Sequence, residues 1–398
     1  MTQLTLANVR PWGAEPVDIT MSGDRIISVA PADRASDDGE HGERLDGGGL
    51  LALPGFINAH AHVDKSWWGQ PWVPYAGEPT TSGRIAHERD RRDGLGIPNL
   101  DSTVAVLREF LRHGTTAVRS HVDVDLGVGL RGIETVREAV DALGGAIEVE
   151  IVAFPQDGVI RRPGVLDLLD RAAEAGATSV GGIDPASIDR DPVAQLDGLF
   201  AVAERRGVGL DIHLHDGGEL GAFQFELILD RARRSGLRDK VTVSHGFALG
   251  ELPAARQEAL LDGCAEAGVS WTTVAPPRTA PLPWRGMRDR SVALGLGTDG
   301  IRDLWSPFGD GDLLRVALGF ARLHGLRTDE ELVHAVELSS RRAAGFVHRR
   351  VHDLVAGARA DIVLMDAENV QDALVRAPGR RLVVSGGRVV VRDGELQV

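Results

Sequence analysis

The sequence predicts an α/β protein in which a (β/α)8 barrel carries a small β domain built from both ends of the chain. The middle of the chain alternates short apolar runs with amphipathic stretches, which is typical of repeated β-α units. Both ends instead carry strand-like runs without long helical stretches between them. We predict that residues 53–349 form the barrel and that residues 1–52 and 350–398 together form a small β-sandwich domain.

The terminal segments alternate apolar and polar residues over short distances. At the amino end, TLANVR and VDITMSGDRIISVAP have the pattern of strands around a turn at Ser22, Gly23 and Asp24. At the carboxyl end, ADIVLMDAENV and RLVVSGGRVVVRDGELQV are also strand-like. Each set is too small to fold alone, so pairing the two into one β unit is the economical solution.

The barrel prediction comes from eight apolar runs with amphipathic stretches such as STVAVLREFLRHG and AFQFELILDRARRSG between most of them. Several of these stretches end in a glycine of the kind that follows a helix, at Gly114, Gly176, Gly207 and Gly268. Eight β-α units favour a TIM-like barrel, with a doubly wound sheet as the alternative. The runs are Leu50–Ile57, Thr115–His121, Ile147–Phe154, Ser179–Ile183, Val208–Leu214, Val241–His245, Val269–Val274 and Val292–Leu296.

Composition narrows the class of partner. The formal charge of −14 disfavours nucleic acid and anionic membranes. The single cysteine, Cys264, excludes an internal disulfide and a cysteine zinc cluster. No apolar run approaches the roughly 20 residues that span a bilayer, and the amino end lacks the pattern of a secretion signal. We expect a cytoplasmic protein with a small-molecule substrate and no nucleic-acid or membrane partner; a homo-oligomer stays open.

The stretch LPGFINAHAHVDK places two histidines, His60 and His62, directly after an apolar run. Side chains alternate along a strand, so both imidazoles point the same way at a strand end. Two neutral imidazoles on one face make half of a transition-metal site. A polar loop without metal is the alternative for such a pair alone, so the rest of the chain has to decide.

Later apolar runs also end in polar side chains. In a barrel the carboxyl ends of all strands meet at one face, where the chemistry of such folds is found. A single histidine there could simply line the barrel mouth, but the joint arrangement favours a site. These residues are His121, Asp123 and Asp125; Gln156; His213, His215, Asp216 and Glu219; His245; and Asp299.

We predict one mononuclear centre in which His60, His62, His213 and Asp299 hold a divalent metal and leave one position for water. Such a metal lowers the pKa of its water toward neutrality. Asp299 could take the water proton, and His245 could orient the nucleophile and stabilise a tetrahedral centre. Asp216 is the nearest carboxylate for carrying a proton to the leaving nitrogen.

The segments HAH, RSHVDVD, AFPQDG, DIHLHD, SHG and GTDGIRDLWSPFG occur in an order that resembles the amidohydrolase superfamily. More narrowly, they resemble its cytosine deaminase-like branch, which includes hydrolases of triazine metabolites. The resemblance implies that the metal is Zn²⁺ or Fe²⁺ and that His245 touches the attacking water. It also implies that Gln156 bonds a ring amide of the substrate and that Trp305 helps to wall the ring pocket.

Three positions qualify this resemblance. The branch usually has Glu where this chain has Asp216, with Glu219 as a less favoured substitute. It also has a second Asp where this chain has Gly300, and Asp303 could compensate. The fourth strand, TSVGGIDP, has no lysine to bridge two metals, which disfavours a binuclear centre.

Two further stretches allow two interpretations each. Lys65 could contact substrate or pair with Asp64 behind the metal site. The run HERDRRD at 87–93 is predicted to be a solvated helix, with a lid over the barrel mouth as the alternative. The predicted reaction is deamination of a cyclic amidine or aminoheterocycle, cytosine-, triazine- or pterin-like. The alternatives are hydrolysis of a cyclic or linear amide and, less favoured, a non-catalytic scaffold.

Overall fold

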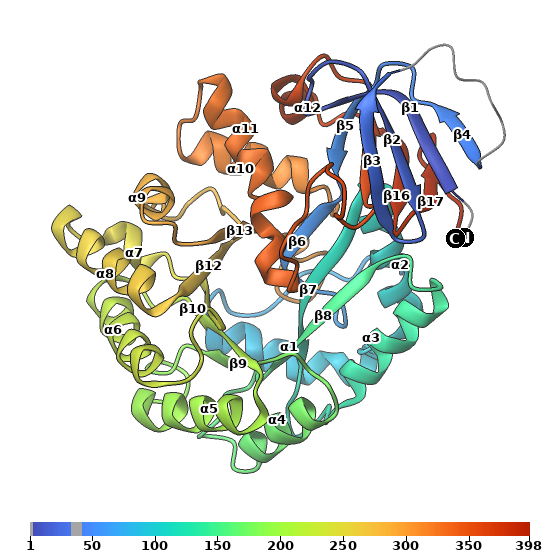
Figure 1. The fold of residues 1–398 in the computed structure, drawn as a ribbon. Helices are drawn as coiled ribbons and strands as arrows, with labels where there is room; N and C mark the ends of the chain where they lie inside the picture. Colours follow the sequence, from blue (N-terminus) through green and yellow to red (C-terminus); the bar gives the residue numbers. More distant parts are fainter. Residues whose placement is uncertain (1–2, 33–41) are drawn as a thin grey trace.

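The computed structural model describes residues 3–32 and 42–398 and contains two separate sheets (Figure 1). Residues 1, 2 and 33–41, which fall within the predicted small β domain, lie outside this description. One sheet is parallel and surrounded by helices, and the other combines strands from both ends of the chain. The predicted architecture, a barrel with a β unit built from both termini, is confirmed.

The barrel sheet runs in the order β13-β12-β11-β10-β9-β8-β7-β6-β14. The short strand β14 follows β13 along the chain and pairs in parallel with the first barrel strand, with Asp299 opposite Ala61, so the sheet closes on itself. Its strands are β6 (Phe56–His62), β7 (Thr115–Asp123), β8 (Glu148–Phe154), β9 (Ser179–Ile183), β10 (Gly209–Leu214), β11 (Val241–His245), β12 (Val269–Thr273), β13 (Leu294–Leu296) and β14 (Asp299–Gly300).

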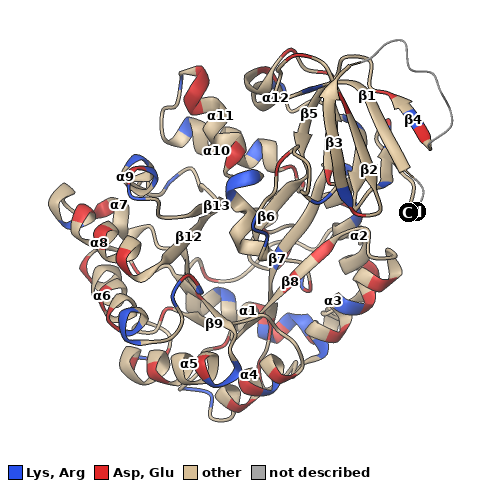
Figure 2. Cartoon of the chain, viewed as in Figure 1, with Lys and Arg blue, Asp and Glu red and all other residues tan. Residues whose placement is uncertain are grey.

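Helices form the outer layer of the barrel, and Figure 2 shows acidic and basic residues interleaved over them. They are α1 (Thr81–Leu95), α2 (Leu100–Arg112), α3 (Arg131–Ala142), α4 (Val165–Glu174), α5 (Pro192–Arg206), α6 (Gly218–Arg234), α7 (Ala248–Glu251), α8 (Ala254–Ala267), α9 (Trp284–Asp289), α10 (Leu313–Leu323) and α11 (Asp329–Glu337), followed by the 3-10 helix η1 (Arg341–Val347). The last helix, α12 (Val370–Arg376), lies instead beside the sheet built from the chain ends (Figure 1). In the part of the chain that is described, none of them has the length and apolarity to cross a membrane.

Local sequence explains where these helices begin and end. The Asn99 side chain accepts a hydrogen bond from the backbone N–H of Ser102 and so caps α2. The same helix buries Val106, Phe110 and their neighbours against the barrel, as its amphipathic spacing requires. The four glycines predicted to follow helices all adopt left-handed backbone conformations, with φ between 69° and 99°.

The second sheet has the order β18-β17-β16-β15-β5-β1-β2-β3, and β4 pairs with β1. The two chain ends meet where β15 runs antiparallel to β5, with Val363 opposite Leu53. The boundaries after residues 52 and 349 stay a prediction about which segments fold as units. The strands are β1 (Gln3–Pro11), β2 (Val17–Ser22), β3 (Arg25–Pro31), β4 (Glu43–Asp46), β5 (Leu51–Pro54), β15 (Ile362–Met365), β16 (Arg380–Ser385), β17 (Arg388–Arg392) and β18 (Glu395–Leu396).

A single residue, Gly55, separates β5 of the terminal sheet from β6, the first barrel strand. Its carbonyl accepts a hydrogen bond from His352 Nε2 at 2.6 Å, and its N–H donates to the carbonyl of Asp361 at 2.9 Å. A Cβ at this position would lie 2.4 Å from Thr116 Oγ1, so only glycine fits. The junction fixes where β6 starts and therefore where His60 and His62 lie at its carboxyl end.

Candidate metal centre and substrate cavity

The carboxyl ends of several barrel strands bring imidazoles from distant parts of the sequence together. Potential ligand atoms of His60, His62, His121 and His213 all lie within 4.8 Å of one another. The same limit holds for a second group made of His60, His245 and Asp299. Asp299 Oδ1 lies 3.6 Å from His60 Nε2 and 3.4 Å from His62 Nε2. His60 belongs to both groups, so the four residues of the predicted ligand set lie around it.

The nitrogen atoms of this cluster fit a metal ion. His60 Nε2, His62 Nδ1 and both ring nitrogens of His213 are buried without a hydrogen-bond partner among the described residues. Buried polar atoms are normally satisfied, so several orphaned nitrogens facing one centre indicate a missing partner. Three imidazoles and a carboxylate are the donor set that zinc or ferrous iron takes in proteins.

The protonation states suit this interpretation. Burial, followed by the charge of Lys65, lowers the pKa of His62 well below the ordinary value. Burial, followed by the neighbouring histidine rings, does the same for His213, so both imidazoles are neutral. Burial also lowers the pKa of His245. Burial opposes ionisation of Asp299, but the adjacent rings of His60 and His62 hold its pKa well below the usual range. Neutral imidazoles and an ionised carboxylate are the forms that bind metal.

A buried network orients His60 from below. Its Nδ1 lies 3.0 Å from Ser244 Oγ, which in turn donates to Asp211 Oδ1 at 2.5 Å. Arg119 Nη1 lies 3.2 Å from the other oxygen of Asp211, and all these groups are buried inside the barrel. Because one ring nitrogen is engaged by this network, the other is left to face the centre. Asp211 and Ser244 were not among the predicted site residues.

His121 at the end of β7 joins the cluster, although it was predicted only as a strand-end residue. Its ring centroid lies 4.2 Å from that of His60 and 4.6 Å from that of His213. Its Nε2 is 3.2 Å from Asp211 Oδ1, but without hydrogen-bond geometry. Burial lowers the pKa of His121 to about 4. It is thus a neutral imidazole beside the predicted ligands.

The backbone is strained at two of the site residues. His245 has φ 67° and Asp299 has φ 60°, both in the left-handed region that residues other than glycine rarely adopt. Trp271 Nε1 donates to the carbonyl of His245 at 2.9 Å and fixes that strand end. Such strain persists where the surrounding structure imposes it, and it is concentrated at functional sites.

A cavity of about 420 Å³ opens directly above the histidine cluster. The predicted substrate residues Gln156, Trp305 and Lys65 line it together with the predicted metal-site residues His62, His213, His245 and Asp299. Phe154, Ile183 and Phe247 add apolar wall. An enclosed apolar pocket with a few converging polar groups is the usual form of a small-molecule site.

One carboxylate that was not predicted holds all three of those substrate residues. Glu88 Oε2 accepts hydrogen bonds from Gln156 Nε2 at 2.8 Å and from Trp305 Nε1, and Lys65 Nζ lies 3.6 Å away. Glu88 belongs to α1, and only 2% of it is exposed. The prediction of a solvated helix at 87–93 is therefore wrong for this face. Glu88 and Arg92 are four residues apart, so they share one side of the helix, and that side faces buried partners.

Lys65 is ion-paired as well as cavity-lining. Its Nζ is 3.3 Å from Asp123 Oδ1, whereas Asp64 accepts a hydrogen bond from the backbone N–H of Asp123 at 3.0 Å. Burial disfavours the ammonium, but Asp123 and Glu88 raise the pKa of Lys65 above its ordinary value. Of the two predicted roles of Lys65, its place in the cavity lining is compatible with substrate contact, and its ion-pair partners are Asp123 and Glu88.

The candidates for proton transfer are arranged differently from the prediction. Asp216 is not among the cavity-lining residues, and its carboxylate accepts a hydrogen bond from Gln224 Nε2 at 2.9 Å. Glu219 forms an ion pair with Arg256 on α8. His215 does line the cavity, and its ring stacks on that of His245 at 4.6 Å.

A buried acid stands behind His215. His215 Nδ1 lies 2.7 Å from Asp184 Oδ2, and Asp184 is 1% exposed. Burial alone would favour the neutral ring, but the charge of Asp184 and its hydrogen bond raise the pKa of His215. His215 and Asp184 thus form a pair that can hold a proton at the edge of the cavity.

The position of Gly300 is explained by Asp303. Asp303 lines the cavity, and its Oδ1 accepts hydrogen bonds from the backbone N–H groups of Trp305 and Ser306, both at 2.8 Å. Burial raises the pKa of Asp303 to about 6, although the charge of Lys65 opposes the rise. A carboxylate is therefore present on this side of the cavity, but it comes from three residues further along the chain.

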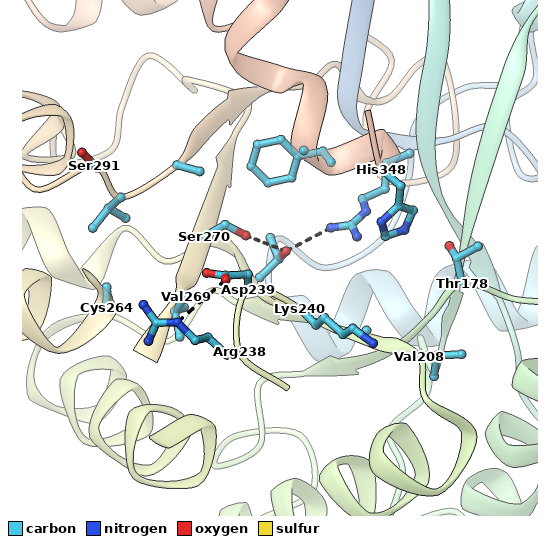
Figure 3. Close-up of a pocket in the computed structure, with 18 of the residues that line it drawn as sticks. Thr178, Val208, Arg238, Asp239, Lys240, Cys264, Val269, Ser270, Ser291 and His348 are labelled. Carbon is cyan, nitrogen blue, oxygen red and sulfur yellow. Dashed lines mark hydrogen bonds and ion pairs between the residues drawn. The ribbon is translucent and has the colours of Figure 1, made fainter. Parts of the chain in front are cut away.

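A larger cavity of about 870 Å³ lies at the opposite end of the barrel (Figure 3). It is lined by residues just before or at the start of strands, such as Thr178, Val208, Lys240 and Val269. None of the clustered histidines lines it. In barrels of this kind the chemistry belongs to the carboxyl ends of the strands, so the smaller cavity is the candidate site.

Comparisons with known proteins agree with this geometry. A crystal structure of N-isopropylammelide isopropylaminohydrolase from Burkholderia multivorans is 42% identical and matches the whole of both chains with a TM-score of 0.94. The N-isopropylammelide isopropyl amidohydrolase of Pseudomonas sp. (strain ADP) is 28% identical over 94% of each chain. The pterin deaminase of Rhizobium rhizogenes is 26% identical over 96% of this chain and 89% of its own length. The sequence profile described as "Amidohydrolase family" matches residues 99–391, and the chain therefore belongs to the amidohydrolase family.

Proposed function

We propose that this chain hydrolyses the bond between a ring carbon and an exocyclic nitrogen in an aminoheterocycle of the triazine, pyrimidine or pterin type. The observation that supports the proposal is the cavity whose lining includes His213 and Asp299 together with Gln156 and Trp305. Its volume of about 420 Å³ suits a single flat heterocycle. The names of the relatives, an isopropylammelide hydrolase and a pterin deaminase, support a substrate of this class.

We assign one divalent ion, zinc or iron, to His60, His62, His213 and Asp299. Such an ion supplies Lewis-acid chemistry, because it lowers the pKa of a water molecule and makes a nucleophile near neutral pH. The orphaned nitrogens of His60, His62 and His213 support this assignment. His121 is an alternative ligand that would make a set of four imidazoles, because its potential ligand atom lies in one group with those of His60, His62 and His213.

In the proposed reaction Asp299 accepts a proton from the attacking water. The water oxygen forms a bond to the amino-bearing ring carbon, and His245 stabilises the charge that develops there. The carbon–nitrogen bond then breaks, and the exocyclic nitrogen leaves as ammonia or an amine after gaining one proton. The ring keeps the oxygen as a carbonyl group. The second water proton ends on the adjacent ring nitrogen, and the ring stays closed.

His215, with Asp184 behind it, is our candidate for delivering that proton. It lines the cavity and stacks on His245, whereas the predicted shuttle Asp216 bonds to Gln224. A histidine with a neighbouring carboxylate is a common proton donor near neutral pH. The Gln156 amide and the Trp305 ring are assigned to hold the heterocycle flat above the cluster.

The test is to incubate the zinc- and iron-loaded protein with an alkylamino-dioxotriazine, cytosine and pterin. Released ammonia or amine and the mass of the ring product are measured. The expected product is an intact ring in which a carbonyl oxygen has replaced the exocyclic nitrogen. The rate of ammonia or amine release should fall on the order of 10²-fold or more in His245→Ala. A ring-opened carboxylate as the sole product would favour amide hydrolysis instead.

A further inference from the structure

Helix α1 contributes to the wall of the cavity with an inward face that carries both apolar and charged residues. Thr81 and Arg84 line the cavity, and Ile85 packs in one apolar cluster with Phe154 and Trp305. Glu88, one turn beyond Arg84, bonds to two of the cavity-lining side chains. The helix is thus part of the lining of the cavity, through Thr81 and Arg84 directly and through Glu88 by its hydrogen bonds.

Arg84 is a cation without a partner among the described residues. Its side chain makes no hydrogen bond or ion pair with any described residue, and its Nε is buried without a partner. The neighbouring cations differ: Lys65 is paired with Asp123, and Arg92 makes two hydrogen bonds to Asp125. A guanidinium is always charged, so a partly buried one facing a cavity is suited to an oxygen of the ligand.

Glu88 fixes which end of the Gln156 amide faces the ligand. The Glu88 oxygen receives hydrogen bonds from Gln156 Nε2 and Trp305 Nε1 beside the Lys65 ammonium, so it acts as an acceptor. The amide must therefore turn its NH₂ group toward Glu88. Its carbonyl oxygen, which accepts hydrogen bonds, is left for the cavity.

We propose that Arg84 binds an oxo oxygen of the substrate ring, while Gln156, held in one orientation by Glu88, accepts a hydrogen bond from the adjacent ring N–H. This inference rests on the proposed function and narrows it. The substrate class is an oxo-substituted ring with an N–H beside its carbonyl group. A ring that carries only amino groups would place donors against Arg84 and would be rejected.

Binding of rings that cannot react tests this without requiring turnover. Cyanuric acid offers oxo and N–H groups and has no amino group to lose, whereas melamine offers amino groups only. The metal-loaded parent should bind cyanuric acid and discriminate against melamine in isothermal titration calorimetry. Arg84→Met should weaken cyanuric acid binding by about 10-fold to 100-fold, the effect of losing a charge-assisted hydrogen bond. Arg84→Lys should recover part of the affinity.

Arg89→Met is the matched control, because Arg89 lies on the same helix and pairs with Asp157 at the surface. It should bind cyanuric acid as the parent does. Glu88→Gln should reduce the preference for cyanuric acid over melamine, since a side-chain amide can accept either orientation of Gln156.

The proposal is overturned if the parent does not bind cyanuric acid, if Arg84→Met binds it as tightly as the parent, or if that variant loses both rings equally. These outcomes differ from a failure of the proposed function. If Arg84-dependent binding is seen but no aminoheterocycle loses its nitrogen, the reaction assignment fails and the recognition site stands.

Discussion

Gly300 leaves the space that the Asp303 carboxylate occupies: a Cβ on residue 300 would lie 1.7 Å from Asp303 Oδ2. The backbone of residue 300 is not in the left-handed region, so glycine is required by this close approach and not by its conformation. The two positions therefore act together. A side chain at position 300 would displace the Asp303 carboxylate from its present position.

Gly300→Ala should accordingly displace Asp303 and lower kcat/KM for the best heterocyclic substrate by roughly tenfold or more, about 1.4 kcal/mol of transition-state stabilisation. Bound metal should be unchanged. Gly319→Ala is the control, because a Cβ there meets no atom within 4 Å. Full activity of Gly300→Ala would show that the position of Asp303 is not needed for turnover.

The barrel and its histidine cluster could be predicted from the sequence, because both follow from the spacing of apolar residues and from the position of polar residues at strand ends. Alternation along β6 predicts that His60 and His62 share a face, and the meeting of strand ends brings His213 to them. The same alternation carries a signal for His215, which shares a face with His213, whereas Asp216 falls on the opposite side. The spacing of the family motif led to Asp216 instead.

The inward face of α1 could not be predicted in this way. Charged residues at 87–93 have the composition of a solvated helix, and periodicity does not show that their partners are buried. Glu88 and Arg92 find Lys65 and Asp125 on the strand-end segments that follow β6 and β7. Such pairings depend on the tertiary fold, and only coordinates reveal them.

His213→Ala should lower the metal content of the protein. One buried imidazole is lost from the cluster, and the nitrogens of His60 and His62 are left with a less complete donor set. Metal bound per chain after dialysis is measured by mass spectrometry, with a decrease of about tenfold or more expected. His348→Ala, at an exposed histidine near Glu150, is the control. Unchanged occupancy in His213→Ala would remove this residue from the ligand set.

Substitutions at two neighbouring residues, His215 and Asp216, distinguish which of them protonates the leaving nitrogen. His215→Gln should keep the metal but lower kcat on the order of 10²-fold or more, because the side chain that we propose protonates the leaving nitrogen can no longer donate a proton. Asp216→Asn should retain most of the activity, since its partner is Gln224. The reverse result, an active His215→Gln and an inactive Asp216→Asn, would restore the carboxylate that the sequence predicted.

The ion pair between Arg92 and Asp125 should dominate the stability of the mouth of the barrel. Both side chains are 5% exposed, and two hydrogen bonds join them at 2.5 and 2.8 Å. Asp125→Ala leaves a buried guanidinium unpaired and should cost about 3–5 kcal/mol in the free energy of unfolding. The double variant Arg92→Met/Asp125→Leu should recover much of that loss. A single variant as stable as the parent in urea denaturation would refute this assignment.

His324 provides a pH-dependent contribution to stability far from the cavity. It follows α10, and its ring centroid lies 4.2 Å from that of Phe320. Burial, followed by the charge of Arg285, lowers the pKa of His324 to about 4. In the unfolded chain the pKa of a histidine is about 6.5, so the unfolded state binds more protons between these values. The neutral ring therefore stabilises the fold fully above about pH 6.5, and this contribution is lost as the pH falls toward 4.

His324→Gln removes this titration and should leave a flatter profile. Thermal midpoints of parent and variant are compared at about pH 7.5 and about pH 5, where other acidic groups affect both proteins equally. The parent should lose more of its midpoint on acidification than the variant does. Parallel profiles would mean that the pKa of His324 is the same in the folded and unfolded chains, and that the ring packed beside Phe320 remains open to protons from solvent.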